Sequence, residues 1–254
     1  MPEKNYVALG KKNIVSASNS TSPKTILVYA RNKKGKSTLC ASAGKGNILM
    51  LDPERGGVHL KTADPDLWAI KKWDDIDEAR GFLATGQHKY TWVGLDGLTQ
   101  FYGMALNFVV KNREREQNMT VQPGMLTKKD WGQANKVMKA MMHSFWSLGL
   151  NVIMTAQERV MENKDREADE ETGSEDVSYV ADLSAGCRGE AYALADVIGR
   201  LYVANVDMPN GSVKKQRRLW ISDHPLYDTG GRADVQLPDY IKNPTIARIM
   251  RLIG

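Results

Sequence analysis

The sequence predicts an α/β fold in which a mainly parallel, twisted sheet is covered by helices. From Lys24 onward, short apolar runs alternate with segments of helical periodicity, a pattern typical of such a sheet. The run at 25–30 is continuous, as expected for a strand buried on both faces. Late in the chain, Pro209-Asn210-Gly211 has the turn chemistry of an antiparallel hairpin. We therefore expect a parallel sheet with a C-terminal antiparallel hairpin.

Seven strands are expected. Each is a short run rich in apolar or β-branched residues, and the third is the weakest of them. The last two flank the turn and form the hairpin. In chain order the expected strands are 25–30, 47–52, 67–70, 90–96, 150–155, 200–206 and 217–222.

Two helices are expected from local signals. One opens directly after the first strand, at 36–43. The other spans 130–148, where Asp130 can cap the helix while Gln133 reaches back in a variant of the capping box. Its apolar residues recur at three- and four-residue spacing until Gly149 stops it. Many of them are methionines, which we expect to pack in the core.

Two segments show neither the apolar runs of a strand nor the periodicity of a helix. Residues 1–23 are polar and rich in Ser, Asn and Lys, which predicts a flexible basic arm ahead of one domain at 24–254. Residues 158–178 are rich in acids and predict a mobile loop after the fifth strand.

Composition excludes several classes of protein. The chain has 254 residues, of which 42% are hydrophobic and 26% charged, as in an ordinary globular protein. No apolar run is long enough for a transmembrane helix, and residues 1–12 lack the apolar core of a secretory signal. The two cysteines make a disulfide framework unexpected, and the four histidines form no metal-ligand pattern. We expect a cytoplasmic protein without a membrane partner.

Charge is unevenly distributed along the chain. Residues 1–50 hold nine bases against one acid, and residues 207–254 hold eight bases against five acids. Residues 158–176 instead hold nine acids against three bases. A basic surface attracts polyanions such as nucleic acid, although it also serves solubility.

The strongest local signal is the segment from Ala30 to Thr38. It follows a buried strand and opens a helix, which is the setting of a phosphate-binding P-loop. Backbone N–H groups would surround the phosphates, Lys36 would bridge the β- and γ-phosphates, and Ser37 would coordinate Mg²⁺. The alternative is a solvated lysine-rich turn. The expected nucleotide-binding residues are Ala30, Arg31, Asn32, Lys33, Lys34, Gly35, Lys36, Ser37 and Thr38.

One position departs from the usual P-loop pattern G-x-x-x-x-G-K-S. Ala30 stands at the first glycine. Alanine does not tolerate a positive φ, so the substitution tests whether this position needs a left-handed residue.

Three polar residues follow other expected strands, at the sheet edge where the P-loop must lie. Asp96 ends the fourth strand and is expected to hold Mg²⁺ through water, as a Walker B aspartate does. Glu54 follows the second strand and is the expected base for the attacking water, unless it and Asp52 only shape the turn. Gln157 ends the fifth strand and is either a γ-phosphate sensor or a surface glutamine.

The order of these motifs resembles the RecA-like recombinase core, and more narrowly the short phage-encoded RecA-like ATPases that act in single-strand annealing or recombination. The resemblance spans roughly Lys24 to Ile253 and rests on 30–38, 51–54, 93–99 and 151–157. It implies a RecA-like ATPase domain that hydrolyses ATP with Mg²⁺, catalysed by Lys36, Glu54 and Gln157.

The resemblance also implies partners. Such proteins form homo-oligomeric rings or filaments with ATP between protomers, act on single-stranded DNA and work beside a single-strand-binding protein. Arg232 stands where related chains carry a Lys/Arg pair, so it is either a finger acting in the neighbour's site or a turn arginine. A phage-encoded protein would lie in the host cytoplasm.

DNA contacts are harder to place, because the acidic segment at 158–176 would repel phosphates. Basic candidates and aromatic residues that could stack on bases lie elsewhere. The basic candidates are Arg188, 128–129, 214–218 and the N-terminal arm; the aromatic ones are Trp131, Tyr192 and Trp220.

Two other functions remain open. An ATP-switched assembly or loading factor without its own DNA contact would suit the acidic segment. A small-molecule P-loop kinase would need an arginine-rich lid, against which the acids at 158–176 argue.

Overall fold

The computed structural model describes residues 22–118, 120–122, 125–162 and 177–253. Most of the expected arm at 1–23 and of the expected loop at 158–178 therefore lies outside the described residues. The elements, in chain order, are β1 (Thr25–Ala30), α2 (Lys36–Ala41), β2 (Ile48–Asp52), η2 (Gly56–His59), β3 (Asp66–Ala69), α3 (Asp74–Ala84), β4 (Trp92–Asp96), α4 (Leu98–Gln117), α5 (Lys128–Trp146), β5 (Asn151–Glu162), β6 (Val177–Ala181), α6 (Ala185–Leu194), β7 (Val197–Asp207), β8 (Val213–Trp220), β9 (Gly230–Gly231), β10 (Tyr240–Lys242) and α7 (Ile246–Ile253).

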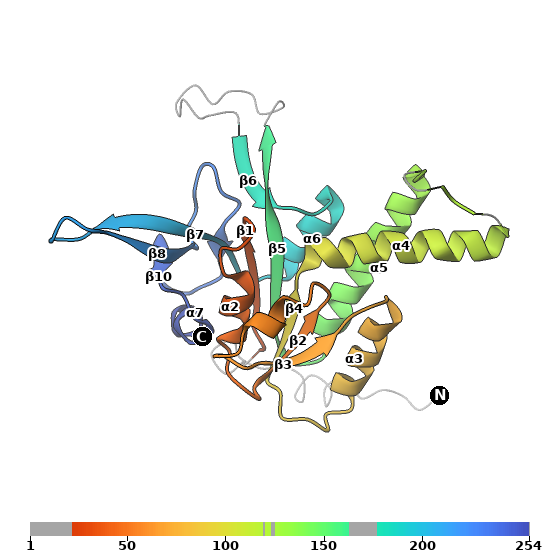
Figure 1. Ribbon diagram of the computed structural model, residues 1–254, viewed down its shortest axis with the longest axis horizontal. Coiled ribbons are helices and arrows are strands. Elements are labelled where there is room, and N and C mark those ends of the chain that lie inside the picture. Colours follow the sequence, from red (N-terminus) through yellow and green to blue (C-terminus); the bar gives the residue numbers. More distant parts are fainter. Residues whose placement is uncertain (1–21, 119, 123–124, 163–176, 254) are drawn as a thin grey trace, which may run out of the picture.

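A single sheet organises these elements (Figure 1). Its strand order is β10-β8-β7-β1-β5-β4-β2-β3, and the stretch from β7 to β3 is parallel throughout. Antiparallel pairing begins at β7–β8, the hairpin expected around Pro209-Asn210-Gly211. The predicted fold class, a mainly parallel sheet with helices and a C-terminal antiparallel hairpin, is confirmed.

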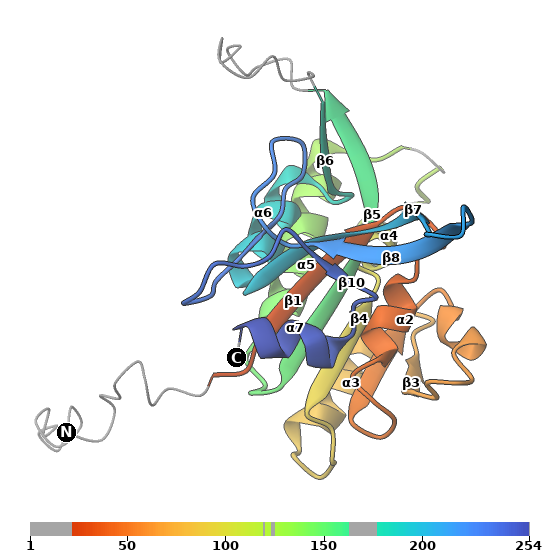
Figure 2. The same ribbon diagram turned by 90° about the vertical axis from the view of Figure 1, so that its left-hand side faces the viewer.

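Helices cover both faces of the sheet. One face packs against α3, α4, α5 and α6 around Phe101, Met138 and Phe145, all fully buried. The other packs against α2 and α7, and Figure 2 shows α7 lying across the strands on this side. Successive residues of β1 alternate between the two cores: Leu27 belongs to the first, and Ile26 and Val28 to the second. The methionines of α5 lie in the core, as expected.

Two expectations about local structure are wrong. The fifth strand does not end near Gln157, because β5 continues to Glu162 and pairs with β6 in an antiparallel hairpin. Residues 158–162 and 177–178 are therefore strand rather than loop. The long helix α5 is capped by Thr127, not by Asp130. Thr127 accepts from the backbone N–H of Asp130, whose carboxylate accepts from the backbone of Thr127 in return.

None of the described helices is long and apolar enough to cross a membrane.

Candidate nucleotide site

The loop between β1 and α2 has the backbone geometry of a phosphate-binding turn. Positive φ angles occur at Lys33 (60°) and Gly35 (100°), while Ala30, the last residue of β1, is not among the described residues with a positive φ. Ala30 is fully buried, and its carbonyl accepts a hydrogen bond from Lys36. Alanine therefore fits the first position of the motif, since the left-handed turn is made further along the loop.

Lys36 points back across this loop. Its Nζ donates to the carbonyl of Ala30 at 3.1 Å and to Oε1 of Gln157 at 2.9 Å. Burial lowers the pKa of Lys36, while the charges of Asp96, Glu54 and Glu158 act in the opposite direction. An ammonium held between a carbonyl and an amide oxygen is positioned to receive a phosphate.

Asp96 ends β4 and is buried, with an exposed fraction of 6%. Its Oδ1 accepts a 2.5 Å hydrogen bond from the hydroxyl of Thr155 on β5. Burial raises the pKa of Asp96, against the hydrogen bonds from Ser37 and Thr155, which lower it. The hydroxyl of Ser37 and the carboxylate of Asp96 thus adjoin each other, and hard oxygen ligands of this kind suit an Mg²⁺ ion that is also bound by phosphates.

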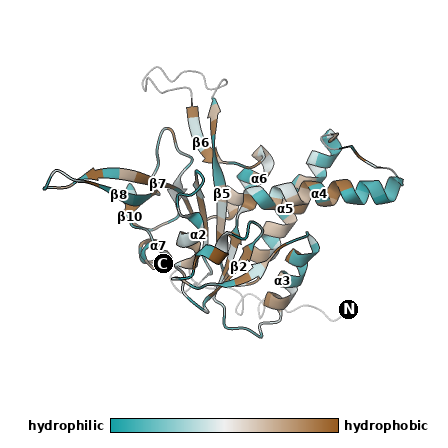
Figure 3. Ribbon diagram, in the orientation of Figure 1, coloured by the Kyte–Doolittle hydropathy of each residue, from teal (hydrophilic) through white to brown (hydrophobic). Residues whose placement is uncertain are grey.

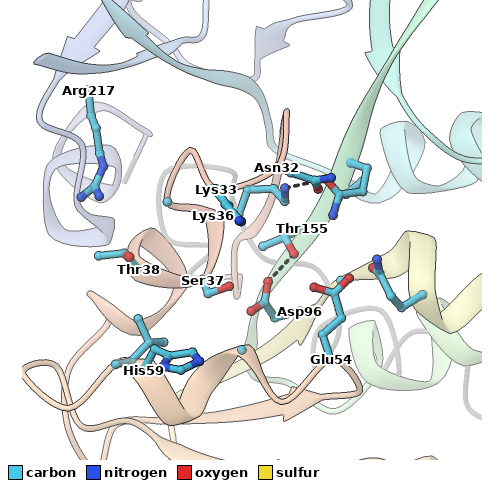
Figure 4. Close-up of a pocket in the computed structure, with 17 residues that line it drawn as sticks. Asn32, Lys33, Lys36, Ser37, Thr38, Glu54, His59, Asp96, Thr155 and Arg217 are labelled. Carbon is cyan, nitrogen blue, oxygen red and sulfur yellow. Dashed lines mark hydrogen bonds between the residues drawn. The ribbon is translucent and has the colours of Figure 1, made fainter. Parts of the chain in front are cut away.

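The two acids after β2 have different roles. Asp52 is buried and accepts hydrogen bonds from the backbone N–H groups of Gly56 and Gly57, at 3.1 and 2.7 Å, so it shapes the turn into η2. Glu54 lines the same cleft as Lys36 and Asp96 (Figure 4). Partial burial raises the pKa of Glu54, as does the charge of Asp96, while Lys36 opposes them. A carboxylate with a raised pKa is a suitable proton acceptor.

Gln157 lies between the phosphate loop and Asp96 because β5 is inserted between β1 and β4. It is paired in register with Ala30. Its side chain accepts from Lys36, and its backbone N–H donates to the hydroxyl of Thr99 at the start of α4. Gln157 is therefore a cleft residue in the middle of a strand rather than a surface glutamine.

These side chains share one cleft of about 650 Å³ at the carboxyl edge of the parallel strands. Of the nine expected nucleotide-binding residues, Ala30, Arg31 and Lys34 do not line it. Arg31 points to Glu158, which also binds Arg200. The expected residues that line the cleft are Asn32, Lys33, Gly35, Lys36, Ser37, Thr38, Glu54, Asp96 and Gln157.

Arg232 lies at the opposite edge of the sheet. Its guanidinium donates to the carbonyl of Ala193 at 2.8 Å and lies 3.9 Å from the carboxylate of Asp196. Asp196 precedes β7 and binds the backbone N–H of Thr25, where β1 begins. Arg232 is therefore remote from the cleft of its own chain.

Among the cleft residues that were not expected, two have ionisable side chains. Arg217 comes from β8, and a Cβ placed on Gly35 would lie 2.9 Å from its Nε. His59 is the last residue of η2. The sequence marks Arg217 only as part of a basic run and carries no local signal for His59.

A strand–loop–helix that presents Lys36 and Ser37, with an acid on a nearby strand, defines a P-loop nucleoside triphosphatase. A protein-family model described as an AAA domain matches residues 22–233, and the chain belongs to this family. It is thus a nucleotide-binding ATPase of the P-loop class. No match was found among the curated proteins. The narrower resemblance to phage-encoded RecA-like proteins stays a prediction.

Proposed function

We propose that the protein hydrolyses ATP with Mg²⁺ and that it acts on single-stranded DNA in recombination or annealing. Lys36 binds the β- and γ-phosphates, and Glu54 takes the proton of the water that attacks the γ-phosphorus, with ADP as the leaving group. Ser37 and Asp96 would hold Mg²⁺, which neutralises the charge that develops on the phosphates. Gln157, bonded to Lys36, senses whether the γ-phosphate is present.

The DNA role rests on the hairpin formed by β7 and β8. The hairpin projects from the body of the molecule, and its tip is hydrophilic (Figures 1 and 3). Residues 214–218 include four basic side chains, of which those of Lys214, Lys215 and Arg217 are exposed. The next one along, Arg217, reaches Gly35 of the phosphate loop. This contact carries the proposal, because DNA bound to Lys214 and Lys215 would act directly on a strand that touches the nucleotide site.

The position of Arg232 supports the proposed oligomerisation. Because it lies at the edge of the sheet remote from its own cleft, it can contribute to hydrolysis only in a neighbouring protomer. A head-to-tail arrangement of this kind produces a ring or a filament with nucleotide between protomers. If the protein acts on single-stranded DNA, a single-strand-binding protein is the partner that we propose for it.

The test is ATP hydrolysis with and without single-stranded DNA, over a range of salt concentrations. We expect stimulation by DNA that fades as salt rises. The double variant Lys214→Ala/Lys215→Ala should weaken DNA binding and lower the slope of log affinity against log salt by about 1.4, since each contact to a single strand contributes about 0.7. Lys71→Ala/Lys72→Ala removes a matched exposed pair on the loop before α3 and serves as the control. If single-stranded DNA leaves ATP turnover unchanged at every salt concentration, a DNA-dependent ATPase is excluded.

One observation favours a second function, an ATP-switched assembly or loading factor without its own DNA contact. The β5–β6 hairpin continues directly from Gln157, and the segment it begins, 158–176, has nine acids against three bases. A segment of this composition would repel DNA and attract a basic protein partner. DNA-independent turnover together with stimulation by a basic partner protein would favour this function.

A further inference from the structure

The two ends of the cleft differ in chemistry (Figure 4). One end holds Glu54 and Asp96, which the proposed function places at the γ-phosphate. The other lies beside Thr38 and is bounded by Arg217 and His59. Because a triphosphate is a linear chain, the end that carries the nucleoside must leave the loop on the side away from Glu54. The nucleoside therefore enters the part of the cleft that Arg217 and His59 border.

These two side chains reach the cleft from elements far apart in the sequence. Arg217 approaches along β8, with its Nε and Cζ at 2.9 and 3.1 Å from a Cβ placed on Gly35. His59 comes from η2, which packs against the start of α2: a Cβ on Gly56 would lie 3.9 Å from Oγ of Ser37. Leu60, which follows η2, adds a partly buried apolar side chain to the same wall.

Both side chains are available to bind a ligand. Within the described part of the chain, neither the guanidinium of Arg217 nor the imidazole of His59 has a hydrogen-bond partner or an ion pair. Two other arginines near the site, Arg200 and Arg31, are engaged instead, since both bind Glu158. An exposed cation and an exposed ring that share a cleft without partners are available for a ligand.

We propose that Arg217 and His59 form the binding site for the nucleotide base, which they hold by stacking. A guanidinium is planar and stacks on aromatic faces, and an imidazole also presents a flat ring. The proposal rests on the proposed binding of ATP and specifies how its base is held. It also places a base-binding residue on the same hairpin that carries Lys214 and Lys215.

The experiment compares two probes, MgATP and inorganic tripolyphosphate with Mg²⁺, which carries the phosphate chain without a nucleoside. Binding is measured by calorimetry for the wild type, Arg217→Lys, Arg217→Ala, His59→Ala and the control Arg80→Ala. Arg217→Lys keeps the charge and removes the planar group. Arg80 is an exposed arginine on α3, away from the cleft.

We expect wild-type protein to bind MgATP more tightly than tripolyphosphate. Arg217→Lys and His59→Ala should each weaken MgATP binding about 3- to 30-fold, the range of a stacking contact, and change tripolyphosphate binding less than about twofold. Arg80→Ala should change neither. Equal losses for both probes in Arg217→Ala would place the arginine on the phosphates and overturn the proposal. So would unchanged MgATP binding by Arg217→Lys and His59→Ala.

The two probes distinguish an error in the proposed base site from an error in the proposed binding of ATP. If wild-type protein binds both probes equally well, the phosphate site stands and the base site is refuted. If it binds neither probe, the proposed ATPase function is refuted as well.

Discussion

The ion pair between Glu158 and Arg200 permits a sharp test of what holds the phosphate loop against the sheet. The Glu158 side chain is 2% exposed and that of Arg200 12%, and Nε of Arg200 lies 2.7 Å from Oε2 of Glu158. Tyr179 and Tyr227 enclose the guanidinium, with ring centroids 4.3 and 4.2 Å from its Cζ. Burial lowers the pKa of Arg200, but the hydrogen bond and charge of Glu158 outweigh it and the net shift is upward. Arg200 thus stays charged inside the protein.

Glu158→Gln removes the negative charge and keeps the size of the side chain. Breaking a buried pair on one side costs about 3–5 kcal/mol, because the other charge is left without compensation. The second partner of Glu158, Arg31, is 64% exposed, so its loss adds less than about 1 kcal/mol. For a chain of this size about 1 kcal/mol shifts the melting temperature by roughly 2–4 °C, so we expect a fall of roughly 6–20 °C.

Urea and thermal unfolding measure the effect, with Glu78→Gln on the exposed face of α3 as a matched control expected to stay within about 0.5 kcal/mol. The double variant Glu158→Leu/Arg200→Met replaces both charges with apolar groups and should recover most of the lost stability. A loss below about 1 kcal/mol in Glu158→Gln, at an unchanged urea m-value, would refute the reasoning. So would a double variant no more stable than the single one.

Four further predictions concern the nucleotide site. Glu54→Gln should leave ATP binding intact and slow hydrolysis about 10²–10⁴-fold in single-turnover assays; normal turnover would exclude Glu54 as the base. Because the base acts when deprotonated and its pKa is raised, kcat/KM should be lost on the acid side at a higher pH than an ordinary glutamate would give. Ala30→Gly should keep the Kd for nucleotide and lower the free energy of unfolding by about 1 kcal/mol, whereas a gain in nucleotide affinity would show that alanine strains the loop. Arg232→Ala and Lys36→Ala should each be inactive alone but regain part of the ATPase activity when mixed, and no recovery would mean that Arg232 does not act between protomers.

Local sequence patterns were sufficient to predict those site residues that belong to one strand and the turn that follows it. The strands that lead to the P-loop, to Glu54 and to Asp96 are short apolar runs, and the functional residues lie at or just after the end of each strand. Because β2 and β4 are parallel neighbours and β5 alone separates β4 from β1, the carboxyl ends of all three strands meet at one edge. Lys36, Glu54 and Asp96 could therefore be predicted to lie together.

Features that depend on pairing between distant segments could not be predicted in this way. The extension of β5 beyond Gln157 depends on pairing with residues 177–181, and the intervening polar sequence resembles a loop. The position of Arg217 depends on β8 lying beyond β7 from β1, which no local pattern encodes. The start of α5 was misplaced because both Thr127 and Asp130 are good capping residues, and the two exchange hydrogen bonds in the structure.

The unbroken course of β5 through Gln157 determines what kind of signal this residue can send. In a flexible loop, a displacement of Gln157 would be lost within a few residues. A paired strand instead moves as a rigid unit, and β5 is held in the sheet between β1 and β4. The five residues from Glu158 to Glu162 extend about 17 Å at roughly 3.3 Å each. A tilt of about 5° at Gln157 would therefore displace the end of this arm by about 1.5 Å, amplifying a small adjustment around a phosphate into a movement at the protein surface.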